Sequence, residues 1–335
     1  MMESGVLIFL LKIVGAIVIA FLGITIGLFY KGLDRKIAAK MQSRIGPPIR
    51  QPFYDFFKLM IKETVVPENA VPWVFNGAPL LALVSTITIL FYIPIASFPA
   101  LLGGSGDLIL IAYLLAIPAV ALVVGGFSSG STYASIGAQR EMVLMMSYEL
   151  PLVTIIIALG WRLNLAYPGL NIFSLDILTA NPIWGVVGPL GFLGAILLLF
   201  TLAIVTPAEL SIVPFDTPEA ETELAGGALV EYSGRNLALF ELANAVKLVV
   251  MAALTVVLFF PYNIAHLFSF SGVFARIIDI LFFVLKMFIV IFFEATYIRV
   301  ALARFKIDQA SVTYLIYLSV VGLMGLLLIV VDYLI

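Results

Sequence analysis

Residues 236–261 read NLALFELANAVKLVVMAALTVVLFFP, an apolar run whose only charged residues are Glu241 and Lys247. A helix needs roughly 20 apolar residues to cross the ~30 Å hydrocarbon core of a membrane, and this run is long enough to do so. The whole chain of 335 residues is 63% hydrophobic and 11% charged, with a mean hydropathy of +1.16. Because a water-soluble domain needs a more polar surface, we expect an integral membrane protein.

The same apolar pattern recurs along the chain and predicts about eight membrane-spanning helices. They cover residues 5–30, 77–98, 108–127, 147–163, 185–206, 236–261, 273–299 and 311–334. Strands are not expected, because only closed barrels cross a membrane as β-structure and their alternating pattern is absent. We therefore predict an all-α integral membrane protein in which residues 1–335 form a single membrane domain, a bundle of transmembrane helices.

The loop between the first two predicted spans is long and basic, whereas the next loop, around residues 101–106, has no lysine or arginine. Basic loops stay on the cytoplasmic side, so the first loop is predicted to be cytoplasmic. Counting spans from there places both termini outside, in a multi-pass protein of the plasma membrane. Within the loop, residues 53–63 carry apolar side chains at helical spacing, which predicts an amphipathic helix at the surface.

Several ionisable residues lie in or next to the predicted spans, where an unpaired charge is costly. One interpretation is that they form structural ion pairs that hold helices together. Their number favours a proton relay, in which titratable groups are joined by hydroxyls and water. The predicted relay residues in this group are Glu141, Glu149, Glu241, Lys247, Asp279, Lys286 and Glu294.

A second acidic group lies in residues 214–236, between two predicted spans, with five carboxylates against one basic residue. A short helix that begins at Pro218 and stops at Gly226 explains part of this charge, since acids favour a helix N-terminus. It does not explain all of it, because Glu219 and Glu223 would repel each other one helical turn apart. We interpret the segment as the entrance of the relay, which adds Asp216, Glu219, Glu221, Glu223 and Glu231.

Redox cofactors are expected on other chains. The sequence has no cysteine and a single histidine, so it offers no cysteine-ligated iron-sulfur cluster and no metal site built on a pair of histidines. We therefore expect no catalytic residue, no cofactor-binding residue and no metal ligand in this chain. Its net charge of −2 gives no reason to expect a nucleic-acid partner.

Three motifs in order along the chain resemble the complex I subunit 1 family. They are Arg44-Ile45-Gly46-Pro47, the segment from Ser135 to Leu152 that contains GAQRE and SYELPL, and Pro214-Phe215-Asp216-Thr217-Pro218-Glu219 with Val230-Glu231-Tyr232-Ser233. This family includes the heel subunit of NADH-quinone oxidoreductase and its counterparts in membrane-bound NiFe hydrogenases and related ferredoxin-dependent complexes. The resemblance runs from the first predicted span to the last.

The resemblance implies a non-catalytic subunit that joins a cytoplasmic redox module to an ion-pumping membrane arm. It implies that the acidic segment lies where the redox module docks and that Glu141 and Glu149 belong to the buried relay. The partners that it implies are soluble hydrogenase-like large and small subunits, antiporter-like and small membrane subunits, and the lipid bilayer. Iron-sulfur clusters and a NiFe site would then lie on partner subunits. The docking residues proposed from the basic loops are Arg35, Arg44, Arg50, Arg140 and Arg235.

Two features resemble the hydrogenase branch of the family more than the quinone branch. Residues 47–52 run directly into the amphipathic helix, whereas quinone-reactive members carry a longer spacer there, and the wording around Arg140-Glu141-Met142 and Ser233-Gly234-Arg235 follows the hydrogenase branch. We therefore favour a ferredoxin-linked complex of an archaeon or bacterium that translocates protons or sodium. Two alternatives stay open, a quinone-chamber subunit of a complex I and a stand-alone ion-coupled transporter.

Overall fold

The computed structural model describes residues 2–104, 106–167, 169, 173–265 and 272–335, without the side chains of residues 2–8, 221 and 222. Helices dominate the part of the chain described, and no strand occurs there beyond one isolated bridge between Ile95 and Phe98. The predicted all-α class is therefore confirmed. In lipid a helix satisfies its own backbone hydrogen bonds, which is why apolar runs of this length fold in this way.

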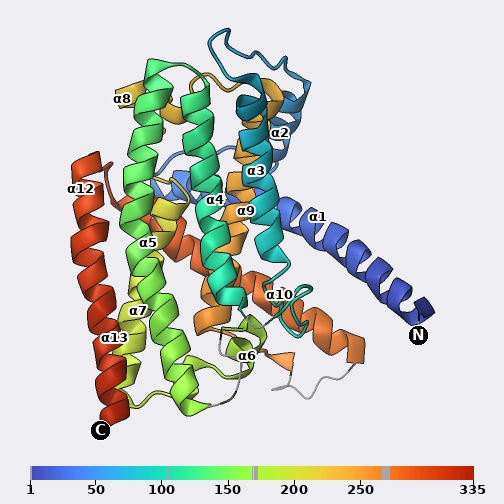
Figure 1. The fold of residues 1–335 in the computed structure, drawn as a ribbon, viewed down its shortest axis with the longest axis vertical. Helices are drawn as coiled ribbons and strands as arrows, with labels where there is room; N and C mark the ends of the chain where they lie inside the picture. Colours follow the sequence, from blue (N-terminus) through green and yellow to red (C-terminus); the bar gives the residue numbers. More distant parts are fainter. Residues whose placement is uncertain (1, 105, 168, 170–172, 266–271) are drawn as a thin grey trace.

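Seven helices in the described ranges are long and apolar enough to cross a membrane (Figure 1). They are α1 (Met2–Met41), α3 (Pro72–Leu90), α4 (Asp107–Ser128), α5 (Thr132–Ala166), α7 (Pro189–Glu209), α9 (Gly234–Phe259) and the continuous helix formed by α12 (Ile307–Val312), η5 (Thr313–Leu318) and α13 (Ser319–Leu334). The shorter elements are α2 (Gln51–Ile61), α6 (Leu175–Ala180), η1 (Ile183–Gly185), α8 (Glu221–Leu224) and η2 (Gly227–Leu229).

The predicted span 273–299 is also helical, but it is not among these seven. It corresponds to α10 (Gly272–Ile291), the π-helix η4 (Phe292–Tyr297) and α11 (Ile298–Ala301). This helix carries Arg276, Asp279, Lys286 and Glu294, more charge than any other predicted span. The sequence therefore predicted one more membrane-crossing helix than length and composition support.

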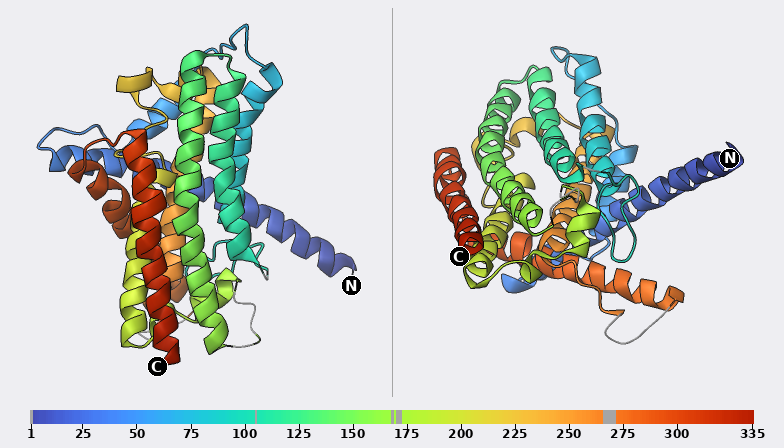
Figure 2. Two further views of the ribbon diagram at one scale, coloured as in Figure 1. Left: turned by 60° about the vertical axis from the view of Figure 1, so that its left-hand side comes forward. Right: turned by 60° about the horizontal axis from the view of Figure 1, so that its bottom comes forward.

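Helix α9 forms the centre of the bundle, and nearly all of its side chains are buried. Its neighbours include α1, α3, α7 and α10, so the helix quoted first from the sequence is the one around which the others pack. Close approach depends on small residues, since a Cβ at Gly27 of α1 would lie 2.4 Å from the carbonyl oxygen of Ala245. Away from this contact, α1 and α10 extend outward from the bundle (Figures 1 and 2).

The predicted amphipathic helix is present as α2, which lies at the same end of the bundle as α8 and the acidic segment (Figure 1). Phe53 and Phe56 pack against the cluster formed by Leu28 and Leu242, and this contact fixes α2 against α1 and α9. A polar residue, Asp55, lies between them on the other face. The amphipathic pattern therefore predicted both the helix and the face that it buries.

The short acidic helix begins later than the sequence predicted. It covers only Glu221–Leu224, and Ala225 and Gly226 end it in left-handed conformations with φ of 53° and 107°. The predicted start at Pro218 is wrong because the carbonyl of Pro218 accepts a hydrogen bond from the Ala228 amide, which holds the backbone in a turn. The predicted stop at Gly226 is confirmed.

Candidate functional site

A buried ion pair between α7 and α9 forms the centre of the candidate site. Glu209 is the last residue of α7, and its Oε1 lies 2.9 Å from the Nζ of Lys247 on α9. Both side chains are almost completely buried, with 1% and 4% of their surface exposed. Two charges removed from water in this way stabilise each other only as long as both remain, so each residue requires the other.

Helix α5 adds two polar groups beside this pair. The Glu141 side chain is buried, and its Oε2 has no hydrogen-bond partner among the described residues. The Tyr148 hydroxyl lies beside the Glu209 carboxylate but makes no hydrogen bond of good geometry within the same part of the chain. Buried polar atoms are nearly always hydrogen-bonded in folded proteins, by water if not by protein. These two atoms therefore mark positions where a water or a transferred proton would be accommodated.

A small cavity of about 20 Å³ connects these groups. Its polar lining consists of Glu141, Glu209, Glu219, Asn244 and Lys247, contributed by α5, α7, α9 and the acidic segment. A volume of roughly 10–15 Å³ open to the centre of a water molecule is enough to hold one water, provided that it finds polar partners. The cavity therefore offers room for about one water that would join carboxylates from three parts of the chain.

A second cavity of about 190 Å³ lies next to the first. The two share Ser211, Glu219 and Asn244, so these residues form the boundary between them. The polar lining of the second cavity also includes Asp34, whose Oδ2 lies 2.9 Å from Nη1 of Arg299.

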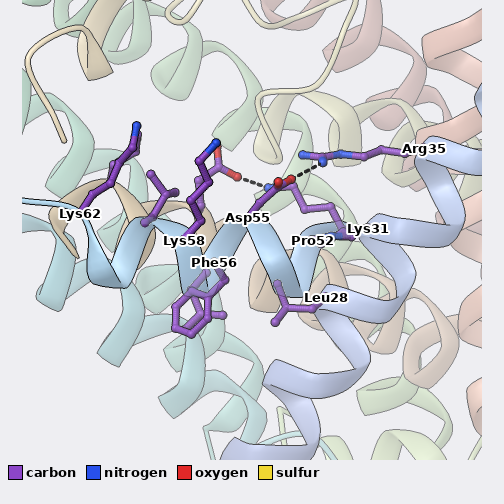
Figure 3. A pocket seen from close by; sticks show the side chains of 12 residues that line it. Leu28, Lys31, Arg35, Pro52, Asp55, Phe56, Lys58 and Lys62 are labelled. Atoms are coloured by element: carbon purple, nitrogen blue, oxygen red, sulfur yellow. Dashed lines mark hydrogen bonds and ion pairs between the residues drawn. The ribbon is translucent and has the colours of Figure 1, made fainter. Parts of the chain in front are cut away.

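Lys31 and Glu241 belong to the lining of this second cavity and also to that of a third, of about 270 Å³ (Figure 3). The two residues form an ion pair between α1 and α9. In the third cavity Arg35 faces Asp55, with 2.9 Å between Nη1 and Oδ2. Three cavities with shared lining residues thus lead from the surface groove beside α2 to the buried Glu209–Lys247 pair.

The two carboxylates of this series that lie outside the spans differ in pKa. Burial raises the pKa of Glu219 to about 8, and the nearby carboxylates of Glu241 and Glu141 add to the effect while Lys31 opposes it. Burial acts in the same direction on Asp55, but hydrogen bonds from Arg35 and Gln51 outweigh it, so the pKa of Asp55 lies below its ordinary value. Glu219 is therefore protonated at neutral pH, whereas Asp55 is charged.

The structure brings together four of the relay residues predicted from the sequence, namely Glu141, Glu219, Glu241 and Lys247. In the acidic segment, Asp216 pairs with Arg304 at 2.6 Å, and Glu223 pairs with Arg140. Glu231 is half-buried in the same segment. Glu221 begins α8, but its side chain lies outside the described part of the chain.

Four further relay residues lie apart from these cavities. Asp279 accepts hydrogen bonds from the Ser97 hydroxyl and from the Ala265 amide at 3.0 Å, and Lys286 donates to the carbonyls of Phe260 and Tyr262 at 2.7 and 2.8 Å. Phe260 lies about 20 Å along α9 from Lys247, at a rise of 1.5 Å per residue. Glu149 is half-buried on α5, and Glu294 is buried in η4. Their role in a relay stays a prediction.

Sequence reasoning missed two acidic residues of the site, Glu209 and Asp34. Glu209 lies one helical turn beyond the predicted end of the span 185–206, and Asp34 lies among basic residues that were read together as a loop. The signal for Glu209 was available, because an acid that directly follows the apolar run of α7 is buried if the helix continues. The signal for Asp34 was not, because its partners Arg299 and Thr296 are far away in the sequence.

The arginines proposed for docking fall into two classes. Arg35 and Arg140 are half-buried and hold acidic side chains, Asp55 and Glu223. Arg44, Arg50 and Arg235 are exposed, as a docking surface requires. Their contact with a partner stays a prediction.

The arrangement suits proton exchange. Carboxyl groups of different protonation state face shared cavities, where a water or a hydroxyl can carry a proton between them. In the described ranges, no group of three histidine, cysteine or acidic residues is placed to hold a metal ion. The chemistry that the site supports is thus movement of protons and charge.

Comparisons with known proteins agree on one family. Residues 13–330 match the sequence family described as NADH dehydrogenase. A membrane protein of Rhizobium meliloti (strain 1021), named as a subunit of NADH-quinone oxidoreductase, is 33% identical over 299 residues, which make up 83% of this chain and 83% of that protein. A chain in the structure of the membrane-bound sulfane sulfur reductase, described as an archaeal respiratory membrane complex, superimposes with a TM-score of 0.79 at 25% identity, over 94% of this chain and 98% of the other.

Proposed function

This chain belongs to the NADH dehydrogenase subunit 1 family, and from that premise we propose that it is a non-catalytic membrane subunit of a complex I-like respiratory assembly. In this proposal it anchors a cytoplasmic redox module and couples electron transfer there to ion translocation. The chain's own residues move protons and charge, and the redox centres belong to partner subunits.

The observation that carries the proposal is the series of three cavities that ends at the Glu209–Lys247 pair. Glu219 lines both of the inner cavities, so a change in its charge acts on the pair through the smallest one. Its pKa of about 8 allows that change near neutral pH. A partner that brings negative charge to the acidic segment would favour the protonated form, and one that brings positive charge would favour the ionised form.

Within the family, we favour a ferredoxin-dependent complex of the hydrogenase or sulfur-reductase type. The short connection between Arg44 and α2 supports this branch, and the archaeal sulfane sulfur reductase covers nearly the whole chain. Partners would then be hydrogenase-like large and small subunits, which would carry the iron-sulfur clusters, together with antiporter-like membrane subunits.

The test uses the intact complex in closed vesicles and measures two rates in parallel, dye-coupled electron transfer and ion pumping. Glu219→Gln and Glu141→Gln remove a titratable group with little change of shape. We expect both variants to keep the electron-transfer rate and to lose most of the ions pumped per electron. Glu68→Gln, an exposed carboxylate outside the cavities, is the control and should match the wild type. Normal pumping per electron in both site variants would exclude the coupling role.

A second candidate is a quinone-chamber subunit, which the cavity between α1, α2 and α9 favours. Its apolar lining includes Leu28, Phe56 and Leu59, and its volume is about 270 Å³. Pockets for organic ligands usually measure roughly 300–1,000 Å³, so this one lies just below that range. Its mouth is also occupied by the Arg35–Asp55 pair, which is why we rank quinone binding second. Inhibition of the intact complex by quinone-site inhibitors, with competition by added quinone, would reverse this order.

A further inference from the structure

Glu294 is a buried carboxyl group away from the three cavities, and its neighbours are oxygen atoms. It lies in η4, with 4% of its surface exposed, and faces Thr255 of α9, whose Oγ1 lies 3.4 Å from Oε2. The Thr206 side chain of α7 lies within hydrogen-bonding reach of the same carboxyl. Among the residues that the structure describes, no lysine or arginine forms an ion pair with Glu294.

The hydroxyl protons of the two threonines are directed elsewhere. Thr206 donates to the carbonyl of Leu202 at 2.9 Å, and Thr255 lies 3.1 Å from the carbonyl of Met251, closer than its distance to Glu294. A hydroxyl has one proton and two lone pairs, so each threonine presents lone pairs toward the carboxyl group. Three oxygens from three helices therefore face one another without a shared donor, and a cation between them would resolve this arrangement.

The backbone at this position adds a further feature. Residues 292–297 form a π-helix, in which carbonyls leave the regular α-helical hydrogen-bond pattern. In membrane proteins, carbonyls at such irregular positions coordinate alkali cations where the helix lines a site. Two residues beyond Glu294, Thr296 donates to Asp34, which lines the cavity of about 190 Å³, so the π-helix lies next to a polar route from the surface.

Charge and ligand type narrow the occupant. Carboxylate, hydroxyl and carbonyl oxygens are hard ligands, which suit alkali and alkaline-earth cations rather than transition metals. A monovalent cation beside one carboxylate leaves no net charge in the interior, whereas a divalent cation would leave a buried positive charge that is costly. We propose that Glu294, Thr206 and Thr255 form a binding site for Na⁺. This site is independent of the coupling role proposed above, because binding is measured without turnover.

The test is labelling of the intact purified complex with a hydrophobic carbodiimide, which modifies protonated buried carboxyl groups. Peptide mass spectrometry then gives the modified fraction of Glu294. Labelling is compared in sodium, potassium and choline chloride at equal ionic strength. We expect Na⁺ alone to protect Glu294, while Glu141, labelled in the same sample, should not respond to the choice of cation.

Two isosteric variants test the ligands. Thr255→Val and Thr206→Val remove one hydroxyl each and keep the shape, so each should raise the Na⁺ concentration for half-protection by about tenfold or more. Thr201→Val is the control, because Thr201 is equally buried on the same helix but lies beside Gly322 of α13. Labelling of Glu294 that Na⁺ leaves unchanged, equal protection by K⁺, or no labelling in Na⁺-free buffer would overturn the proposal.

Discussion

Glu209 and Lys247 join the ends of two helices through an ion pair of 2.9 Å, although both side chains are almost completely buried. Glu209 ends α7 and Lys247 lies in the first half of α9, so the pair fixes how these helices meet beneath the acidic segment. Tyr148 and Glu141 of α5 lie beside it. The stability of this region therefore depends on keeping both charges.

Removing one partner of this pair should be strongly destabilising. Lys247→Met leaves the Glu209 carboxylate buried without its cation, and the expected cost is about 3–5 kcal/mol. The double variant Glu209→Gln with Lys247→Met should recover most of this loss, because no uncompensated charge remains. Melting temperatures of the purified complex measure both effects. The half-exposed pair of Arg35 and Asp55 provides the control, since Arg35→Gln should cost about 1 kcal/mol or less. An equally stable Lys247→Met variant would contradict this view of the pair.

Glu219 should titrate near pH 8. Its pKa is raised to about 8 from an ordinary value of 4.5, so the folded state binds its proton more tightly than the unfolded state does. Stability from this group is present in full below pH 4.5 and decreases as the pH rises toward 8. The infrared carboxylic-acid band of Glu219 should disappear with a midpoint near pH 8 and be missing in Glu219→Gln.

A neighbouring substitution checks the cause of that shift. Glu241→Gln removes a like charge that raises the pKa of Glu219 and also frees Lys31, which lowers it. Both changes act in the same direction, so the midpoint of the Glu219 band should move to lower pH. An unchanged or higher midpoint would show that these charges do not control Glu219.

Gly137 should be intolerant of a side chain. A Cβ there would lie 2.3 Å from the Ala228 amide nitrogen and 2.8 Å from the Pro218 carbonyl oxygen, both backbone atoms of the acidic segment. Gly137→Ala should therefore cost about 1–3 kcal/mol and push the segment away from α5. Faster hydrogen exchange at residues 218–229 would report this displacement.

Gly77 is the matched control for that substitution. It lies inside α3, and a Cβ there meets no atom within 4 Å. Gly77→Ala should therefore stabilise the protein by about 0.5–1 kcal/mol, because alanine restricts the unfolded chain. If both alanine variants were equally stable, close packing of α5 against the acidic segment would not be important.

The exposed arginines of the first loop should determine how firmly a soluble module binds. Arg44→Ala combined with Arg50→Ala should lower the salt concentration at which the module dissociates from purified membranes, since exposed charges act mainly through long-range attraction. Arg276→Ala removes an equally exposed arginine from α10 and should have no effect. Equal dissociation in the two variants would place the docking surface elsewhere.

Much of the fold was predictable because it depends on local properties. The span predicted at 236–261 is the helix Gly234–Phe259, and the amphipathic pattern at 53–63 is the helix Gln51–Ile61. The limits of α8 were less predictable, because the contact between Pro218 and Ala228 holds a turn where the composition favoured helix. The same holds for α10, whose apolar pattern was stronger than its four charges suggested.

By itself, the sequence determined an all-helical membrane bundle, the central apolar helix and the presence of acidic residues at one end of it. These follow from hydrophobic length, because each helix satisfies its own backbone in lipid. Only the tertiary structure decided which charges meet: Lys247 with Glu209 rather than with another acid, and Glu294 with two threonines instead of a base. Such pairings depend on how distant helices pack, and helical periodicity specifies the face of a residue but not the helix opposite it.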